Sequence, residues 1–230
     1  MDELFKILQQ TTAAKVISNS IEYSDYVPLD LSINNTQLAS SGINTANEYA
    51  NYIQNHLNLH KGKIAYGGYL ENRNLYKRSA VFHSEQTEER NIHIGIDLWI
   101  NETAPIYAAL EGKIHSFQNN TAIGDYGPTI ILEHKIESVT FYTLYGHLSL
   151  DSLENKKVGQ LIKKGEQIAN LGMPPINGDY APHLHFQIIR DLENKTGDYP
   201  GVCSLSKVAF YEKNCPNPNL LLKIKESKNN

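Results

Sequence analysis

The stretch "RNIHIGIDLWI", Arg90–Ile100, places a histidine and a carboxylate, His93 and Asp97, inside a run that is otherwise apolar and β-branched. Runs of this composition are typical of buried strands. An unpartnered carboxylate is costly to bury there, so we expect Asp97 to have a compensating partner. His93 and Asp97 would lie on one face of a regular strand, and Gly95 between them would leave space beside that face. A metal ion bound by both side chains would compensate the charge.

The histidines are more numerous than the packing of a β-rich domain requires, since the chain contains nine. Three groups stand out: His93 in "HIGID", His147 in "YGHL", and His183 with His185 in "PHLHF". Residues i and i+2 of a strand point to the same face, so His183 and His185 should project into one pocket. A single histidine in a strand is more often a core residue, but the three groups together favour a metal site.

The residue types in these groups fit a catalytic zinc site. Two imidazoles and one carboxylate would leave one position of a tetrahedral zinc ion open for water. His147 and one histidine of the "HLH" pair would then remain for proton transfer and for stabilising an oxyanion. The sequence therefore predicts a hydrolytic centre.

The three motifs resemble those of the lysostaphin and LytM-type zinc endopeptidases, in which H-x-x-x-D is followed by Tyr-x-His-Leu and then by Gly-Pro-His-Leu-His-Phe. Here they read "HIGID", "YGHLS" and "APHLHFQ". The resemblance runs from about Tyr66 to Arg190 and includes intervening segments such as "APIYAALEGKIHSF" and "VGQLIKKGEQIANLG". It implies a mainly β fold, a compact antiparallel domain of the duplicated hybrid motif (barrel-sandwich hybrid-like) type.

The resemblance also implies a zinc ion, one per chain, and a role for each motif residue. His93, Asp97 and His185 are the implied zinc ligands, and His147 and His183 are the implied catalytic histidines. The implied reaction is hydrolysis of a peptide (amide) bond by a metal-activated water, in peptidoglycan stem or cross-link peptides. The expected partner is therefore a peptide or a peptidoglycan-derived substrate.

Two departures from the family pattern bear on the substrate and on the metal ligands. Members that cut pentaglycine carry a tyrosine shortly before the first metal-binding histidine, and "SEQTEERNI" has none, which disfavours glycyl-glycine cleavage. Where the family commonly has Glu after the "HLHF" motif, this chain has Gln187. Strand alternation places Gln187 on the face of His185, where its amide would hydrogen-bond that ligand and orient it.

Two arginines just before the motif region are candidates for substrate binding. "GGYLENRNLYKRS" contains Arg73 and Arg78. A guanidinium group is suited to clamping a substrate carboxylate, although a solvated surface is the simpler interpretation. We expect the remaining histidines to be structural or rim residues (His115 and His134) or surface residues (His56, His60 and His83).

The chain divides into three parts by the composition and the hydrophobic pattern of its sequence. Residues 1–61 form a small helical and irregular N-terminal segment, in which "DELFKILQQ" and "NTANEYANYIQNHLNL" predict helices and the Asn- and Ser-rich stretch 23–42 predicts an irregular path. Residues 62–192 form the zinc metallopeptidase-like β domain, with short strands separated by Gly, Pro, Asn or Asp. Residues 193–230 predict an irregular C-terminal extension that packs on the β domain and ends in an apolar strand, "NLLLKI".

Composition limits the classes of function. The chain has 230 residues, of which 40% are hydrophobic, and a formal net charge of -4. Its scattered Lys and Arg predict no nucleic-acid partner, and its apolar stretches are too short for a membrane span. No export signal is visible, so we expect a cytoplasmic protein, or a periplasmic or cell-surface one if a leader was removed. Cys203 and Cys215 are expected to be free thiols, because a C-x11-C spacing is poor evidence for a disulfide, and the oligomeric state is not predicted.

Two other classes of function remain open. A domain of the same fold can be a non-hydrolytic metal-binding scaffold or activator, although all five motif positions are present here. "PIYAALEGKIHSF" and "VGQLIKKGEQIA" also resemble halves of biotinyl and lipoyl carriers. A carrier needs its modified lysine in a tight hairpin, usually between methionines, and "LEGKIHS" has no methionine.

Overall fold

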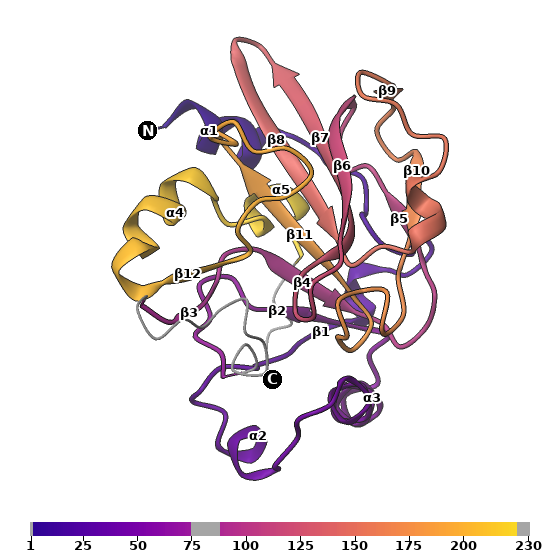
Figure 1. The fold of residues 1–230 in the computed structure, drawn as a ribbon, viewed down its shortest axis with the longest axis vertical. Helices are drawn as coiled ribbons and strands as arrows, with labels where there is room; N and C mark the ends of the chain where they lie inside the picture. Colours follow the sequence, from indigo (N-terminus) through magenta and orange to yellow (C-terminus); the bar gives the residue numbers. More distant parts are fainter. Residues whose placement is uncertain (1, 75–87, 225–230) are drawn as a thin grey trace.

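The computed structural model describes residues 2–74 and 88–224, and these form a mainly β structure with helices near both ends (Figure 1). Its main sheet has eight strands in the order β1-β2-β4-β11-β8-β7-β6-β9. In that order the strands are Tyr26–Pro28, Ile64–Gly67, Ile96–Trp99, His183–Ile189, Val139–Gly146, Gly127–Ile136, Gly112–Asn120 and Leu161–Ile162. Neighbouring strands are antiparallel except β1 and β2, which are parallel. The expected mainly β fold with a small helical N-terminal segment is confirmed.

Two smaller sheets flank the main one in the described part of the chain. In one, β5 (Pro105–Tyr107) pairs with β10 (Gln167–Asn170). In the other, β3 (Arg90–His93) pairs with β12 (Val202–Ser204). This second sheet connects the start of the motif region, in β3, with the segment that follows β11, in β12.

Strand β11 lies at the centre of the main sheet, and each of its residues is buried. Leu184, Phe186 and Ile188 pack in the largest apolar core. His183 and His185 alternate with them, as the period of two residues in a strand requires. Strand geometry therefore places both histidines on the face opposite this core.

The stretch Arg90–Ile100 is not one regular strand, contrary to the prediction. Strand β3 ends at His93 and β4 begins at Ile96, and the two strands belong to different sheets. The break falls at Gly95, where a Cβ atom would lie 2.5 Å from Cε1 of His185. Glycine is therefore required at this position, because any side chain would collide with that imidazole.

Both predicted N-terminal helices are present, as α1 (Glu3–Gln10) and α3 (Ala46–His60). Helix α3 begins with a capping box, in which Thr45 and Glu48 each satisfy the other's backbone N–H. The stretch 23–42, predicted to be irregular, also contains the 3-10 turn η1 (Tyr23–Asp25), strand β1 and the short helix α2 (Thr36–Ser40). The strand was not apparent from the sequence because its hydrogen bonds come from β2, a distant segment.

The C-terminal extension is more regular than predicted. It contains strand β12, the 3-10 turn η5 (Leu205–Lys207), and the helices α4 (Val208–Asn214) and α5 (Asn219–Leu222). Another 3-10 turn, η4 (Leu150–Leu153), lies between β8 and β9. The predicted strand "NLLLKI" is therefore wrong. Pro218 directly before α5 has helical dihedral angles and favours a helix start, and the buried leucines of this helix join the main core beside α1.

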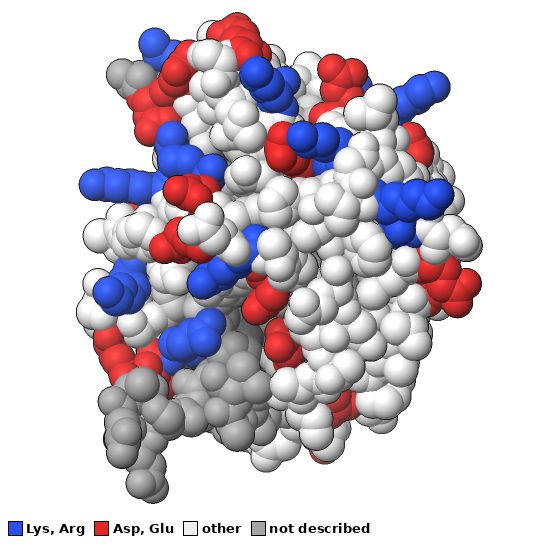
Figure 2. All heavy atoms as spheres, turned by 45° about the horizontal axis from the view of Figure 1, so that its top comes forward, with Lys and Arg blue, Asp and Glu red and all other residues white. Residues whose placement is uncertain are grey.

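Three further properties concern membrane-spanning helices, the two cysteines and the surface charge. Among residues 2–74 and 88–224, the structure contains no helix with the length and apolarity needed to cross a bilayer. Cys203 and Cys215 are both buried free thiols, as expected. On the face in Figure 2, Lys and Arg side chains are interspersed with Asp and Glu side chains rather than gathered in one patch.

Candidate active site

Three side chains from two sheets bring one donor atom each to a common point. Nε2 of His93 lies 2.9 Å from Nδ1 of His185, and Oδ1 of Asp97 lies 3.2 Å and 3.0 Å from these two nitrogens. Ligand atoms of a tetrahedral zinc ion, at about 2.0–2.1 Å from the metal, are separated by about 3.3 Å. The predicted ligands are thus spaced almost as a zinc ion requires, and all three are buried.

The hydrogen bonds behind the two imidazoles fix which nitrogen faces the common point. Nδ1 of His93 lies 2.8 Å from the carbonyl oxygen of Gly68, to which it can only donate. Nε2 of His185 lies 2.9 Å from Oε1 of Gln187. The amide of Gln187 cannot be reversed, because its Nε2 donates to the carbonyl of Pro200 at 3.1 Å. The remaining nitrogens, His93 Nε2 and His185 Nδ1, therefore present lone pairs to the site.

The electrostatic environment keeps these groups in the states that bind a metal. Burial lowers the pKa of His93 to about 4, so this imidazole is neutral. Burial alone would raise the pKa of Asp97, but His93, Arg73 and His183 together lower it well below its usual range. A carboxylate oxygen and two imidazole lone pairs then face one another and repel unless a cation lies between them. The donor set therefore fits a zinc ion.

Arg73 lies against Asp97 rather than on the surface. Its Nη1 donates to Oδ2 of Asp97 at 2.6 Å, its Nε donates to Glu71, and its side chain is only 1% exposed. The prediction that Arg73 clamps a substrate carboxylate finds no support in this arrangement, because a substrate would have to displace a carboxylate of the chain. Arg78, the other predicted clamp, lies outside the described residues.

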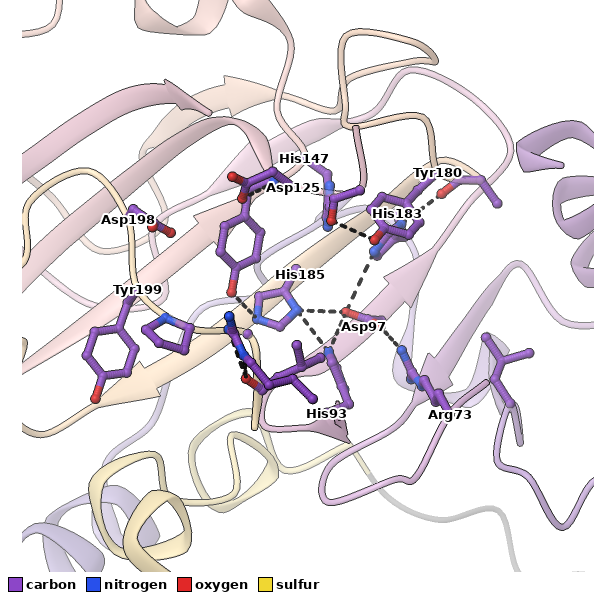
Figure 3. A pocket seen from close by; sticks show the side chains of 18 of the residues that line it. Arg73, His93, Asp97, Asp125, His147, Tyr180, His183, His185, Asp198 and Tyr199 are labelled. Atoms are coloured by element: carbon purple, nitrogen blue, oxygen red, sulfur yellow. Dashed lines mark hydrogen bonds and ion pairs between the residues drawn. The ribbon is translucent and has the colours of Figure 1, made fainter. Parts of the chain in front are cut away.

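The two predicted catalytic histidines lie next to the three donor atoms (Figure 3). His183 Nε2 is 3.8 Å from Oδ1 of Asp97, and the ring centroids of His147 and His183 are 4.2 Å apart. His147 directly follows β8 and has a left-handed backbone, with φ 62°. Its ring lies against that of His183, the first residue of β11.

Both histidines are neutral and have a fixed orientation. Nδ1 of His147 donates to the carbonyl of Asn177 at 2.7 Å, and Nδ1 of His183 donates to the carbonyl of Ala181 at 2.7 Å. Burial lowers the pKa of His183, and burial together with His183 and His185 lowers that of His147 well below its usual range. In each ring Nε2 is therefore unprotonated and able to accept a proton.

These groups line part of a pocket of about 530 Å³, and residues outside the motifs form the rest of its wall. The N-terminal segment supplies the apolar side chains of Leu31, Tyr49 and Ile53, and the segment after β11 supplies Asp198 and Tyr199. The site is therefore continuous with a space large enough for part of a peptide.

Two tyrosines of the pocket were missed in the sequence. The hydroxyl of Tyr126 lies 3.4 Å from Nε2 of His185, and the Tyr180 ring centroid lies 5.1 Å from that of His147. Tyr126 directly precedes β7, and Tyr180 shortly precedes β11. Their position just before strands of the motif region, in "DYGPT" and "GDYAPHLH", was the available signal.

The other histidines lie away from the donor atoms. His134 is buried in the sheet, where Nδ1 donates to the Glu111 carbonyl at 2.7 Å and Nε2 lies 2.7 Å from the Thr143 hydroxyl. It is therefore a structural residue, as expected. His115 is half-buried on β6, His60 is exposed and His56 is partly buried on α3, and His83 lies outside the described residues.

The position of Lys113 does not support the alternative that this chain is a biotinyl or lipoyl carrier. Lys113, the lysine of "LEGKIHS", lies inside β6 and pairs with residues of both β7 and β9. Its ammonium group is 2.9 Å from Glu133. A modifiable lysine belongs at the tip of a hairpin, and Lys113 is not at one.

Three known proteins illustrate what this chain is similar to. An uncharacterised metalloprotease of Haemophilus influenzae is 33% identical over 95 residues, which cover 41% of this chain and 18% of that protein. A zinc-containing peptidase of Vibrio cholerae is 29% identical, with 46% of this chain and 30% of that chain covered and a TM-score of 0.34. The catalytic domain of lysostaphin from Staphylococcus simulans is 25% identical, with 67% and 95% covered and a TM-score of 0.39. The chain thus spans less than a third of the length of the first two relatives.

The family model described as Peptidase family M23 matches residues 91–197. This segment contains all five motif residues, His93, Asp97, His147, His183 and His185. The family resemblance seen in the sequence is confirmed by this match of residues 91–197 to Peptidase family M23.

Proposed function

We propose that this protein is a zinc-dependent endopeptidase that hydrolyses an amide bond in peptidoglycan stem or cross-link peptides. The observation that carries the proposal is the convergence of three lone-pair donors, from His93, Asp97 and His185, beside two neutral histidines in one pocket. A metal-binding scaffold needs the first three residues only. The two additional imidazoles with fixed tautomers supply what hydrolysis requires.

His93, Asp97 and His185 would hold the zinc ion, one per chain. A bound zinc ion would act as a Lewis acid that lowers the pKa of a water molecule and polarises the amide carbonyl. Gln187 supports this site because its carbonyl oxygen holds the Nε2–H of His185 and leaves Nδ1 for the metal. The carbonyl of Gly68 does the same for His93.

His147 and His183 would provide proton transfer and oxyanion stabilisation. One accepts the proton of the attacking water at Nε2 and passes it to the leaving amine, which is worth typically 10²–10⁴-fold in rate. While it carries that proton, the same Nε2–H would donate a hydrogen bond to the tetrahedral oxyanion, worth about 10²–10³-fold. We assign these two roles to the pair jointly, because both imidazoles have the same tautomer and face the same pocket.

The substrate class rests on the family and on the shape of the site. The match of residues 91–197 to Peptidase family M23 supports a peptide substrate, and the resemblance to lysostaphin and LytM-type enzymes supports peptidoglycan peptides. The pocket combines an apolar wall from the N-terminal segment with polar groups around the donor atoms. Such a mixed lining suits a peptide, which offers both polar and apolar groups.

Digestion of purified peptidoglycan and of soluble muropeptides tests the proposal. Each substrate is incubated with the zinc-loaded protein, with the protein plus chelator, and with the chelated protein after zinc is added back, and the products are identified by mass spectrometry. We expect products that have gained one water per cut, loss of cleavage with chelator, and recovery with zinc. A protein that binds zinc but cuts neither substrate would instead be a non-hydrolytic scaffold.

A further inference from the structure

The two oxygens of the Asp97 carboxylate have different partners. Oδ1 faces the two imidazole nitrogens at 3.0 Å and 3.2 Å. Oδ2 accepts a hydrogen bond from Nη1 of Arg73 at 2.6 Å. We propose that Arg73 is a positioning residue that restricts Asp97 to binding zinc through Oδ1 alone, an inference that rests on the zinc site proposed above.

The surroundings of Arg73 hold its guanidinium in this position. Glu71 accepts from Nε of Arg73 with one carboxylate oxygen and from the backbone N–H of Leu31 with the other, at 3.1 Å. Cζ of Arg73 lies 5.5 Å from the ring centroid of Trp99, a cation–π distance. Arg73 is therefore fixed from two sides as well as by Asp97.

Gly68 provides the space that the guanidinium occupies. A Cβ atom at this position would lie 1.8 Å from Nη2 of Arg73, and the backbone has φ 99°, which side chains other than that of glycine rarely adopt. The same residue accepts the hydrogen bond from His93. The turn that positions one zinc ligand thus also makes room for the group that restrains another.

The number of oxygens that Asp97 offers decides whether a coordination position remains open. Two imidazoles and one oxygen leave the fourth position of a tetrahedral site for water, as in catalytic zinc sites. If Oδ2 also bound the metal, it would occupy that position or raise the coordination number. A short charge-assisted hydrogen bond to a rigid, buried arginine competes strongly for Oδ2. Arg73 would therefore preserve the open position that hydrolysis requires.

Cobalt substitution tests the inference, because the visible absorption of Co²⁺ is intense at four-coordinate sites and weaker at sites of higher coordination. We compare the Co²⁺-loaded wild-type chain with Arg73→Met, which cannot donate to Oδ2, and with Arg73→Lys, which can. The matched control is Arg90→Met, since Arg90 also lines the pocket but donates to the carbonyl of Val202. Metal content and melting temperature are measured on the same samples.

We expect Arg73→Met to keep about one metal ion per chain but to lose much of the visible absorption, whereas Arg73→Lys and Arg90→Met keep it. With zinc, kcat of Arg73→Met should fall about 10–100-fold, the range for loss of a group that orients a ligand. A wild-type spectrum in metal-loaded Arg73→Met would overturn the inference, as would an equal loss in Arg73→Lys.

If Arg73→Met does not fold, Gly68→Ala decides, because the added methyl group displaces the guanidinium while the arginine is kept. Since this Cβ would also lie 3.0 Å from Nδ1 of His93, the spectrum is compared only in samples that retain about one metal ion per chain. A wild-type spectrum in this variant would overturn the inference. The proposed function can fail separately. A wild-type chain that has a four-coordinate cobalt spectrum but cleaves no peptide would refute hydrolysis, and the cobalt spectra would still decide whether Arg73 positions Asp97.

Discussion

The imidazole rings of His147 and His183 lie with their centroids 4.2 Å apart, and each ring donates Nδ1–H to a backbone carbonyl. Neither carbonyl belongs to His93, Asp97 or His185. The orientation of the pair is therefore set by the loop 177–181 rather than by the metal. Removal of either ring should disturb proton transfer without removing the metal ligands.

The first prediction concerns these two histidines. His147→Ala and His183→Ala should each lower turnover about 10²-fold or more, the scale for loss of a proton-transfer group or an oxyanion donor. Zinc content should stay near that of the wild type, because His93, Asp97 and His185 are retained. Zinc analysis, thermal unfolding and muropeptide cleavage are measured on the same preparations. Full activity in either variant at unchanged zinc would show that the histidine has been assigned wrongly.

The second prediction concerns Gln187, which accepts from the Nε2–H of His185. Gln187→Leu should weaken zinc binding about 10–100-fold, because the ligand loses the group that fixes its tautomer. Competition with a zinc-binding dye gives the affinity. Gln167→Leu, at the exposed start of β10, is the matched control and should bind zinc like the wild type. Equal affinities in the two variants would exclude an orienting role.

The third prediction concerns the pH dependence of stability and rests on His134, outside the site. Burial lowers the pKa of His134 to about 4, below about 6.5 for an unfolded histidine. The unfolded chain therefore binds the proton first, so the contribution of His134 is complete above pH 6.5 and is lost as the pH falls toward 4. For this residue the loss between pH 7 and pH 5 amounts to about 2 kcal/mol.

Urea unfolding of the zinc-free protein at both pH values measures this contribution. The wild type should lose more stability than His134→Asn on going from pH 7 to pH 5, by about 2 kcal/mol. His60→Asn, a substitution at an exposed position of α3, should behave like the wild type. If His134→Asn shows the same pH dependence as the wild type, His134 is not the titrating group.

Part of the site could be predicted from the sequence because it depends on local geometry. The two-residue period of β11 places His183, His185 and Gln187 opposite Leu184 and Phe186 whatever the rest of the fold. The short β-branched segments between turn residues likewise predicted a mainly β domain. These features need no knowledge of distant contacts.

Other features depend on contacts between distant segments and could not be predicted. His93 and Asp97 converge across a break in the chain at Gly95, which the pattern of apolar residues does not reveal. The position of Arg73 depends on a turn that folds against β3 and on the space left by Gly68. The apolar C-terminal segment formed α5 rather than a strand because a short apolar run fits either structure and tertiary packing decides.

Zinc content is the most direct test of the central claim, that His93, Asp97 and His185 form a zinc site. After zinc loading and dialysis, native mass spectrometry should find one zinc ion per chain in the wild type and little or none in Asp97→Ala and His185→Ala. Asp125→Ala, which removes another carboxylate of the same pocket, should retain the full complement. A wild-type chain without zinc, or an Asp97→Ala variant with a full equivalent, would contradict the account.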